Sequence, residues 1–278
     1  LIRLCAEEDR EAVWALINRA VGYAAHLAEG DEEAEQTLKT VQYQLAHTWH
    51  SKLGWKDHES DDPNTKHLRQ TMLGLMVGAE DAETLNTAIA MFDQAPSLDQ
   101  LPAEQRGLII GAKVRHSKDV DIDALLDAYQ QTHNPDMQMA ITGGLCRARD
   151  PEVIAHIVES AIGEHGFARP QDIFRWFAYL MRSRYTRETA WQWLTSSWER
   201  LEKVFGSSKS FDYFVVYAAA PINTLEWEKR FHEFFEPHLK NILLERNIRI
   251  AYKEIAARVA WRERDEAGLL DYLRQSVN

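Results

Sequence analysis

The apolar residues of this 278-residue chain recur at steps of three and four, and this spacing constrains its fold more than any other feature. Trp191, Leu194 and Trp198, for example, keep these steps along one predicted helix. Asn134 and Asp150 each stand directly before a proline. That arrangement is typical of a helix start, because the side chain caps free N–H groups and proline fits the first turn. Over the whole chain the pattern predicts about a dozen helices joined by short turns.

Short turns between successive helices favour antiparallel packing of neighbours. We therefore predict an all-α fold, a HEAT- or armadillo-like superhelix (solenoid) of antiparallel helix pairs. No sequence repeat of fixed period is visible, and a compact bundle stays open as the alternative. Residues 211–217 (FDYFVVY) have the composition of a strand, but a lone strand has no partner, and we predict a buried helix. We find no linker and expect one domain over residues 1–278.

The composition is that of an ordered protein with an acidic surface. Hydrophobic residues make up 45% of the chain and charged residues 27%, and the net charge is −11. Acidity of this kind repels phosphate backbones, and the basic residues are scattered along the sequence, so we expect no nucleic-acid partner. No apolar run approaches the ~20 residues that cross a bilayer, and no signal peptide opens the chain, so we expect no membrane. The two cysteines, Cys5 and Cys146, suit a reducing cytoplasm.

Candidate metal ligands occur in the chain without the spacing of a metal site. His232 and Glu233 begin the HExxH pattern of zinc peptidases, but Glu236 stands where the second histidine is needed. His47 and His50 are three residues apart and lack a third ligand. We therefore predict no metal ligand in this chain.

Other catalytic patterns are absent from the sequence as well. Neither cysteine has a histidine nearby in sequence, and there is no Gly-x-Ser-x-Gly elbow. Residues 107–113 (GLIIGAK) lack the glycine spacing and the hydroxyl of a phosphate loop. The acidic run at 31–35 (DEEAE) lacks the spacing of a calcium loop and is better explained as a helix start. We predict no catalytic residue, and an enzyme whose residues meet only in three dimensions stays open.

The tryptophan-rich segment carries a resemblance to a known family. Residues 190–194 (AWQWL), with Trp198 and Leu201, resemble the "AW.FL…NW..L" signature of the C-terminal domain of the aminopeptidase N family of zinc aminopeptidases. Within this segment, Trp193 lies off the apolar stripe and is not explained by it. Further loose matches occur in the family's order along nearly the whole chain: Gly54-Trp55, Leu68-Arg69, Arg106, Tyr129, Leu145-Cys146-Arg147, Trp261 and residues 270–273 (LDYL).

The resemblance implies that this chain is most of the C-terminal domain of a larger zinc aminopeptidase, without the first helices of that domain. In the family, a separate catalytic domain holds the zinc, so no cofactor is implied for this chain. The helical domain closes over the catalytic domain, shapes the cavity and contacts the peptide. The implied partners are thus the catalytic domain of the same polypeptide and peptide substrates.

One residue is carried over from the family as a substrate-binding candidate. Arg182, in residues 179–185 (YLMRSRY), matches an arginine that precedes the tryptophan helix in relatives. If Arg182 faces the cavity, its planar guanidinium can hold a peptide carboxylate. The alternative is a surface arginine that favours a helix C-terminus. For the whole chain, the alternative function is a stand-alone helical-repeat scaffold that binds a protein or peptide.

Overall fold

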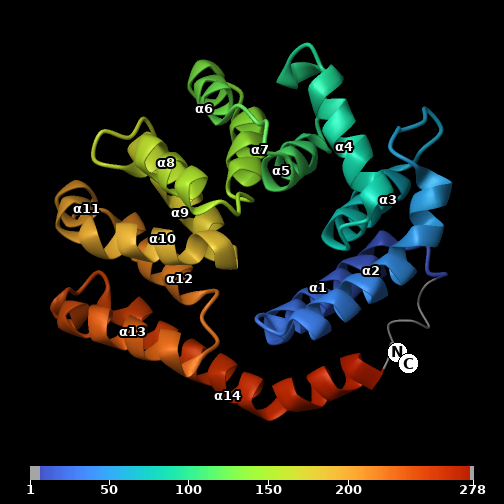
Figure 1. Ribbon diagram of the computed structural model, residues 1–278. Coiled ribbons are helices and arrows are strands. Elements are labelled where there is room, and N and C mark those ends of the chain that lie inside the picture. The colour runs from blue at the N-terminus through green and yellow to red at the C-terminus, as the bar shows by residue number, and fades with distance from the viewer. Residues whose placement is uncertain (1–6, 276–278) are drawn as a thin grey trace. The chain divides into compact units, whose positions relative to one another are not determined.

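The structure, a computed structural model, describes residues 7–275 (Figure 1). These residues form fourteen α-helices and three short 3-10 helices, with no strand among them, which confirms the all-α prediction. The helices group into two compact units, Leu1–Pro96 with Glu263–Asn278, and Ser97–Arg262. The superhelical arrangement and the single domain stay predictions.

The first unit is built on three long helices and their neighbours. Its core joins α1, α2 and α3 around Trp14, Leu45 and Met72, which are almost completely buried. At the other end of α1, Leu273 of α14 packs against Ala28 and Ala34. The helices of this unit are α1 (Glu11–Ala28), α2 (Glu32–Leu53), α3 (Pro63–Gly78), α4 (Ala82–Gln94) and the last part of α14 (Glu245–Gln275).

Aspartate caps begin α2, α3 and α4 of the first unit. The Asp31 side chain accepts a hydrogen bond from the Ala34 N–H, and Asp62 does the same for the Thr65 N–H. The acidic run at 31–35 is therefore the start of α2, as predicted, with its carboxylates near the positive end of the helix dipole.

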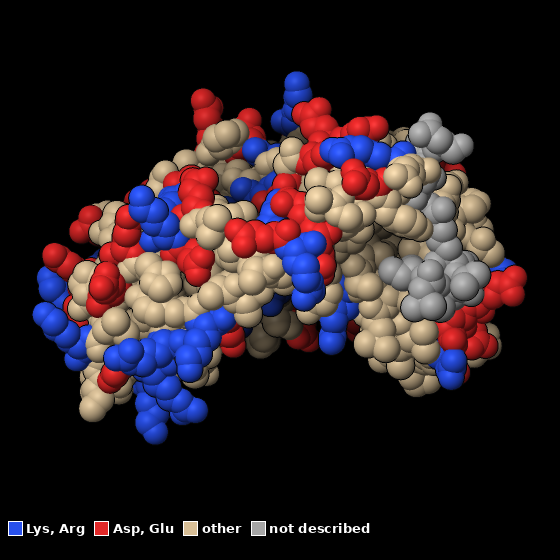
Figure 2. All heavy atoms as spheres, turned by 90° about the horizontal axis from the view of Figure 1, so that it is seen from below, with Lys and Arg blue, Asp and Glu red and all other residues tan. Residues whose placement is uncertain are grey.

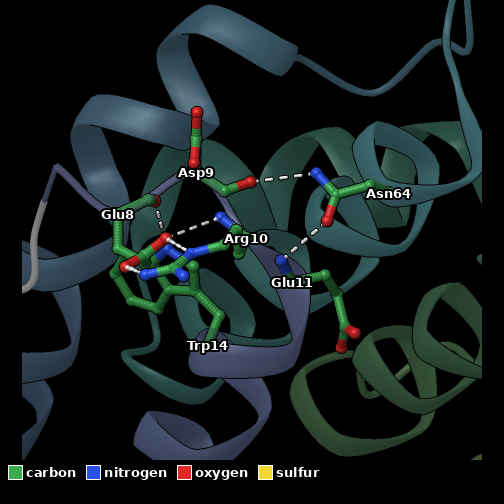
Figure 3. A network of polar contacts seen from close by, with 6 residues as sticks. All are labelled: Glu8, Asp9, Arg10, Glu11, Trp14 and Asn64. Carbon is green, nitrogen blue, oxygen red and sulfur yellow. Dashed lines mark hydrogen bonds and ion pairs between the residues drawn. The ribbon is translucent and has the colours of Figure 1, made fainter.

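Hydrogen bonds join the residues before α1 to α1 and α3 (Figure 3). The Asn64 side chain donates to the Asp9 carbonyl and accepts from the Glu11 N–H, both at 2.9 Å. The Trp14 indole N–H donates to the Glu8 carbonyl at 2.6 Å. Hydrogen bonds from Arg10 lower the pKa of Glu8 to about 2.

The connection between α2 and α3 is held by one buried arginine. Arg69 of α3 is 1% exposed. Its guanidinium donates to the Leu53 carbonyl at 3.1 Å, to Asp57 at 2.5 Å and to Asp61 at 2.7 Å. A buried guanidinium requires such partners, so this loop is an anchored part of the first unit.

The second unit contains the remaining helices. Asn134 and Asp150 each accept hydrogen bonds from two N–H groups of the following turn, which confirms the predicted helix starts. Gly144 of α7 lies so close to α5 that an added Cβ would come within 2.3 Å of Ile110 Cγ2. The helices are α5 (Arg106–His116), α6 (Ile122–Gln131), α7 (Pro135–Leu145), α8 (Pro151–Ile162), α9 (Pro170–Arg182), α10 (Arg184–Ser196), α11 (Trp198–Phe205), α12 (Tyr213–Ala219), α13 (Leu225–Phe235) and the first part of α14.

Two predicted elements of this unit have different outcomes. Residues 211–217 are helical, as predicted: a 3-10 turn, η3 (Lys209–Asp212), leads into α12, and Phe214 is fully buried. The single helix predicted through Trp191 and Trp198 is wrong, because α10 ends at Ser196 and α11 begins after Ser197. Hydroxyl groups explain the break, since the Ser196 side chain donates to the Trp193 carbonyl and competes with regular helix geometry.

The structure also explains Trp193. Its indole N–H donates to the Ile162 carbonyl at 2.7 Å. Arg200 of α11 donates to the Ile162 and Gly163 carbonyls, both at 3.0 Å. The carbonyls that end α8 have no partner inside the helix, and α10 and α11 supply the missing donors. Trp193 and Arg200 therefore fix the α8–α10–α11 junction, defined here by these contacts.

The surface of the molecule carries both acidic and basic side chains. In Figure 2 acidic and basic side chains are interspersed over most of the face shown, and basic side chains gather at its lower left corner. The order of residues in the chain does not show this gathering. No helix within residues 7–275 combines the length and the apolar character needed to cross a membrane.

Candidate functional site

A cleft in the second unit lies between α9 and α12. It has a volume of about 350 Å³. Its α9 residues follow helical spacing and share one face of that helix, and its α12 residues are one turn apart. The cleft is lined by Gln171, Phe174, Arg175, Ala178, Tyr179, Arg182, Tyr213 and Tyr217.

The amphipathic pattern of α9 places these side chains in the cleft. The opposite face of α9 carries Trp176, Phe177 and Met181, all fully buried, so that face fixes the rotation of the helix. Near its start, the buried Asp172 carboxylate accepts a hydrogen bond from Arg169 at 2.8 Å. The cleft face is thereby held toward α12 by the packing behind it.

Arg182 is the last residue of α9 and lines the cleft. Its guanidinium carbon lies 5.5 Å from the centre of the Tyr179 ring, which supports the guanidinium from one side. Among residues 7–275 it has no carboxylate partner within ion-pair distance. Arg182 thus stands at a helix C-terminus, one of the two positions considered from the sequence, and lines this cleft.

Arg175, one turn before Tyr179, is the second cation of the cleft. Its Nη2 lies 3.6 Å from the Asp172 carboxylate. Its Nη1 is buried and has no hydrogen-bond acceptor in the part of the chain that the structure describes. Since buried polar groups normally have a partner, this nitrogen has hydrogen-bonding capacity for a further acceptor.

The cleft combines two guanidiniums with three phenol rings. Arg175 and Arg182 are two helical turns apart, a rise of roughly 10 Å along α9. Guanidinium groups bind carboxylates with planar, paired hydrogen bonds, and tyrosine rings offer apolar faces with a polar tip. The arrangement suits a peptide end or an acidic side chain next to an apolar one. Sequence reasoning identified Arg182 but missed Tyr213 and Tyr217, which come from another helix.

The histidines singled out in the sequence pack against aromatic rings. His47 stacks on Tyr43 with ring centres 4.9 Å apart, and His232 stacks on Tyr252 at 3.7 Å. Burial lowers the pKa of His50. Within residues 7–275 no three His, Cys, Asp or Glu side chains gather as metal ligands. Zinc in an enzyme needs about three such ligands, so the donor set of these residues does not fit that metal.

Of the two cysteines, Cys146 lies in the part of the chain that the structure describes, and its thiol is buried. Cys146 is 3% exposed, and burial raises the pKa of its thiol, so it is not an activated nucleophile. Cys5 lies outside the described residues.

A serine, a histidine and an aspartate do meet in space, which the sequence did not reveal. His156 Nε2 lies 2.6 Å from Asp123 Oδ1, and His156 Nδ1 lies 3.5 Å from Ser160 Oγ. The second distance is long for a hydrogen bond that activates a nucleophile, and the His156 and Asp123 side chains are widely exposed. The contact ties α6 to α8 and does not form a catalytic triad.

Comparison with known proteins gives a consistent set of relatives. The family described as "ERAP1-like C-terminal domain" matches residues 1–257. Aminopeptidase N of Lactococcus lactis subsp. cremoris is 28% identical over 233 residues, which are 83% of this chain and 27% of that protein. Aminopeptidase N of Lactobacillus helveticus is 26% identical over 268 residues, 95% of this chain and 32% of that protein.

A human relative matches over a similar part of the chain. Glutamyl aminopeptidase of Homo sapiens is 24% identical over 226 residues, 81% of this chain and 23% of that protein. The chain therefore spans between 23% and 32% of the length of these three relatives.

Proposed function

The chain belongs to the family of ERAP1-like C-terminal domains, and from that premise we propose that it is the non-catalytic C-terminal domain of a zinc aminopeptidase. The parent enzyme removes N-terminal residues from peptides in the cytoplasm. Relatives that are named aminopeptidases support this proposal, and each is several times longer than the matched segment. In the proposal the zinc lies in a separate catalytic domain of the same polypeptide.

The role proposed for this domain is to close over the catalytic domain and to contact the peptide. The α9–α12 cleft is the proposed contact site, with the Arg182 guanidinium holding a peptide carboxylate. The observation that carries this proposal is the pairing of two cations with three tyrosines in one cleft of a chain with net charge −11. A stand-alone peptide-binding scaffold would use the same cleft without zinc.

Steady-state kinetics of the full-length enzyme test the contact. The Arg182→Ala variant is compared on a long peptide with a free C-terminal carboxylate, on the same peptide with a C-terminal amide, and on a single-residue chromogenic substrate. We expect KM for the free-acid peptide to rise roughly tenfold, because a charge-assisted hydrogen bond is lost. In this proposal the cleft binds the far end of a long peptide, so the KM of the single-residue chromogenic substrate should not change.

A matched control separates the cleft from general charge effects. Arg246 is an exposed arginine of α14 that does not line the cleft, and Arg246→Ala should leave all three substrates unaffected. Unchanged kinetics of Arg182→Ala on the free-acid peptide would remove the proposed contact. Equal loss on the free-acid and amide peptides would show that Arg182 does not bind the terminal carboxylate.

A further inference from the structure

A second cavity lies in the Ser97–Arg262 unit, between the 3-10 turn η2 (Leu98–Gln100) and the connection from α6 to α7. Its volume is about 580 Å³, larger than that of the α9–α12 cleft. It is lined by Ser97, Leu98, Asp99, Ala128, Gln131, Thr132, His133, Asn134 and Met137.

One wall of this cavity is held by a buried arginine. Arg106, at the start of α5, is 7% exposed. Its guanidinium donates to the Leu98 carbonyl at 2.8 Å and to the Leu101 carbonyl at 3.2 Å. Because one planar group holds both ends of the η2 turn, the backbone that carries Asp99 is fixed without any ligand.

The opposite wall is held by a buried glutamine. Gln138 of α7 is 8% exposed, and its side-chain amide donates to the Thr132 carbonyl at 3.1 Å. Asn134 accepts hydrogen bonds from the Asp136 and Met137 N–H groups and so occupies the positive end of α7. The walls of the cavity are therefore held in place without a ligand, and binding does not carry the entropic cost of ordering them.

The side chains that remain for a ligand have a definite chemistry. Leu98, Ala128 and Met137 are apolar residues of the lining, and the exposed Asp99 is its one acidic residue. The C-terminal end of α6 adds the negative end of a helix dipole at Gln131. No lysine or arginine lines this cavity. A cation on an aliphatic stem matches these features, whereas an anion meets the Asp99 carboxylate.

We propose that this cavity binds the side chain of a lysine or arginine presented by a polypeptide. The stem lies on Leu98, Ala128 and Met137, and the cationic head lies at the Asp99 carboxylate. The net charge of −11 favours encounters with basic segments. The proposal does not rest on the proposed enzyme function, since it needs neither zinc nor peptide cleavage.

Calorimetric titration of the full chain with short blocked peptides tests this site. The probe is N-acetyl-Gly-Lys-Gly-amide, and the matched probe carries norleucine, which keeps the stem and lacks the ammonium group. We expect the lysine peptide to bind roughly fivefold more tightly than the norleucine peptide, the range of a partly exposed ion pair. Asp99→Asn should remove this difference and leave the norleucine peptide unaffected.

Glu104→Gln is the control, because Glu104 is an exposed carboxylate a few residues away that does not line the cavity. It should leave the preference for lysine intact. Asp99 is exposed and its side chain has no hydrogen bond within residues 7–275, so Asp99→Asn should fold normally, as circular dichroism checks. Equal affinity for the two peptides, no binding of the lysine peptide, or equal loss in both variants would overturn the proposal.

Discussion

The α8–α10–α11 junction and the α9–α12 cleft use the same kinds of residue in opposite ways. At the junction, Trp193 and Arg200 direct their N–H groups to the carbonyls that end α8. In the cleft, Arg175 and Arg182 lie among three tyrosines. Within residues 7–275, Arg175 Nη1 has no hydrogen-bond acceptor, and Arg182 has no carboxylate within ion-pair distance. Trp193 and Arg200 therefore serve the fold by donating to the end of α8, whereas Arg175 and Arg182 keep hydrogen-bonding capacity for a ligand in the cleft.

The contrast is sharpest between two arginines five residues apart. Arg187 is 6% exposed, and its Nε donates to the Met181 carbonyl at 3.2 Å. Arg182 is exposed and lies over the Tyr179 ring. Residue type alone does not separate the two roles, whereas burial and hydrogen-bond partners do. Each of the following changes tests that distinction, from the largest expected effect to the smallest.

Removing a junction tryptophan should have the largest effect. Trp193→Ala leaves a cavity and deprives the Ile162 carbonyl of a donor, and we expect the free energy of unfolding to fall by about 3–5 kcal/mol. Urea denaturation followed by circular dichroism measures this change. Leu225→Ala is the control, since Leu225 is 62% exposed and should cost little. Similar losses in the two variants would contradict a structural role for Trp193.

Substitution of Arg187 should lower the free energy of unfolding, whereas substitution of Arg182 should affect peptide contact and not stability. Arg187→Ala leaves the Met181 carbonyl short of a donor, and we expect a loss of about 1–3 kcal/mol. Arg182→Ala should change stability by less than about 0.5 kcal/mol, the range of surface substitutions. Thermal denaturation of the two variants under one condition measures both. The distinction fails if Arg182→Ala destabilises the protein as much as Arg187→Ala.

The packing around Trp198 of α11 should respond to acid through His238. This ring packs against Trp198 with centres 4.8 Å apart, and burial lowers its pKa from the ordinary value of 6.5. Between the lowered pKa and 6.5 the unfolded chain binds more protons than the folded one, so folding stability falls as pH drops below about 6.5. The stability is fully present above that pH.

Variants at two histidines isolate this pH effect. His238→Leu should reduce the loss of stability measured by urea denaturation between neutral and mildly acidic pH. His67→Leu, at an exposed histidine of α3, should leave the pH dependence unchanged. An unchanged pH dependence in His238→Leu would show that this residue does not make folding stability sensitive to acid.

Features set by neighbouring residues could be predicted from the sequence. The caps at Asn134 and Asp150 and the helix start in residues 31–35 depend on side chains a few positions from the N–H groups they bind. The break at Ser197 was missed, because the apolar stripe continues through it while hydroxyl groups redirect the backbone.

Features that join distant segments could not be predicted in this way. The Trp193 partner is a carbonyl 31 residues away, and the cleft needs Tyr213 and Tyr217 of α12 beside α9. Arg182 was found only through the family resemblance. The cavity at Asp99 gave no sequence signal, because its lining comes from two separate segments, residues 97–99 and 128–137.

The central claim is that this chain is the non-catalytic domain of a zinc aminopeptidase. The most direct test is the mass and the zinc content of the native polypeptide that carries this sequence. We predict a zinc-containing polypeptide several times longer than 278 residues, with an HExxH motif before this segment. A zinc-free native protein of about this length would contradict the claim and leave a helical scaffold that binds a protein or peptide.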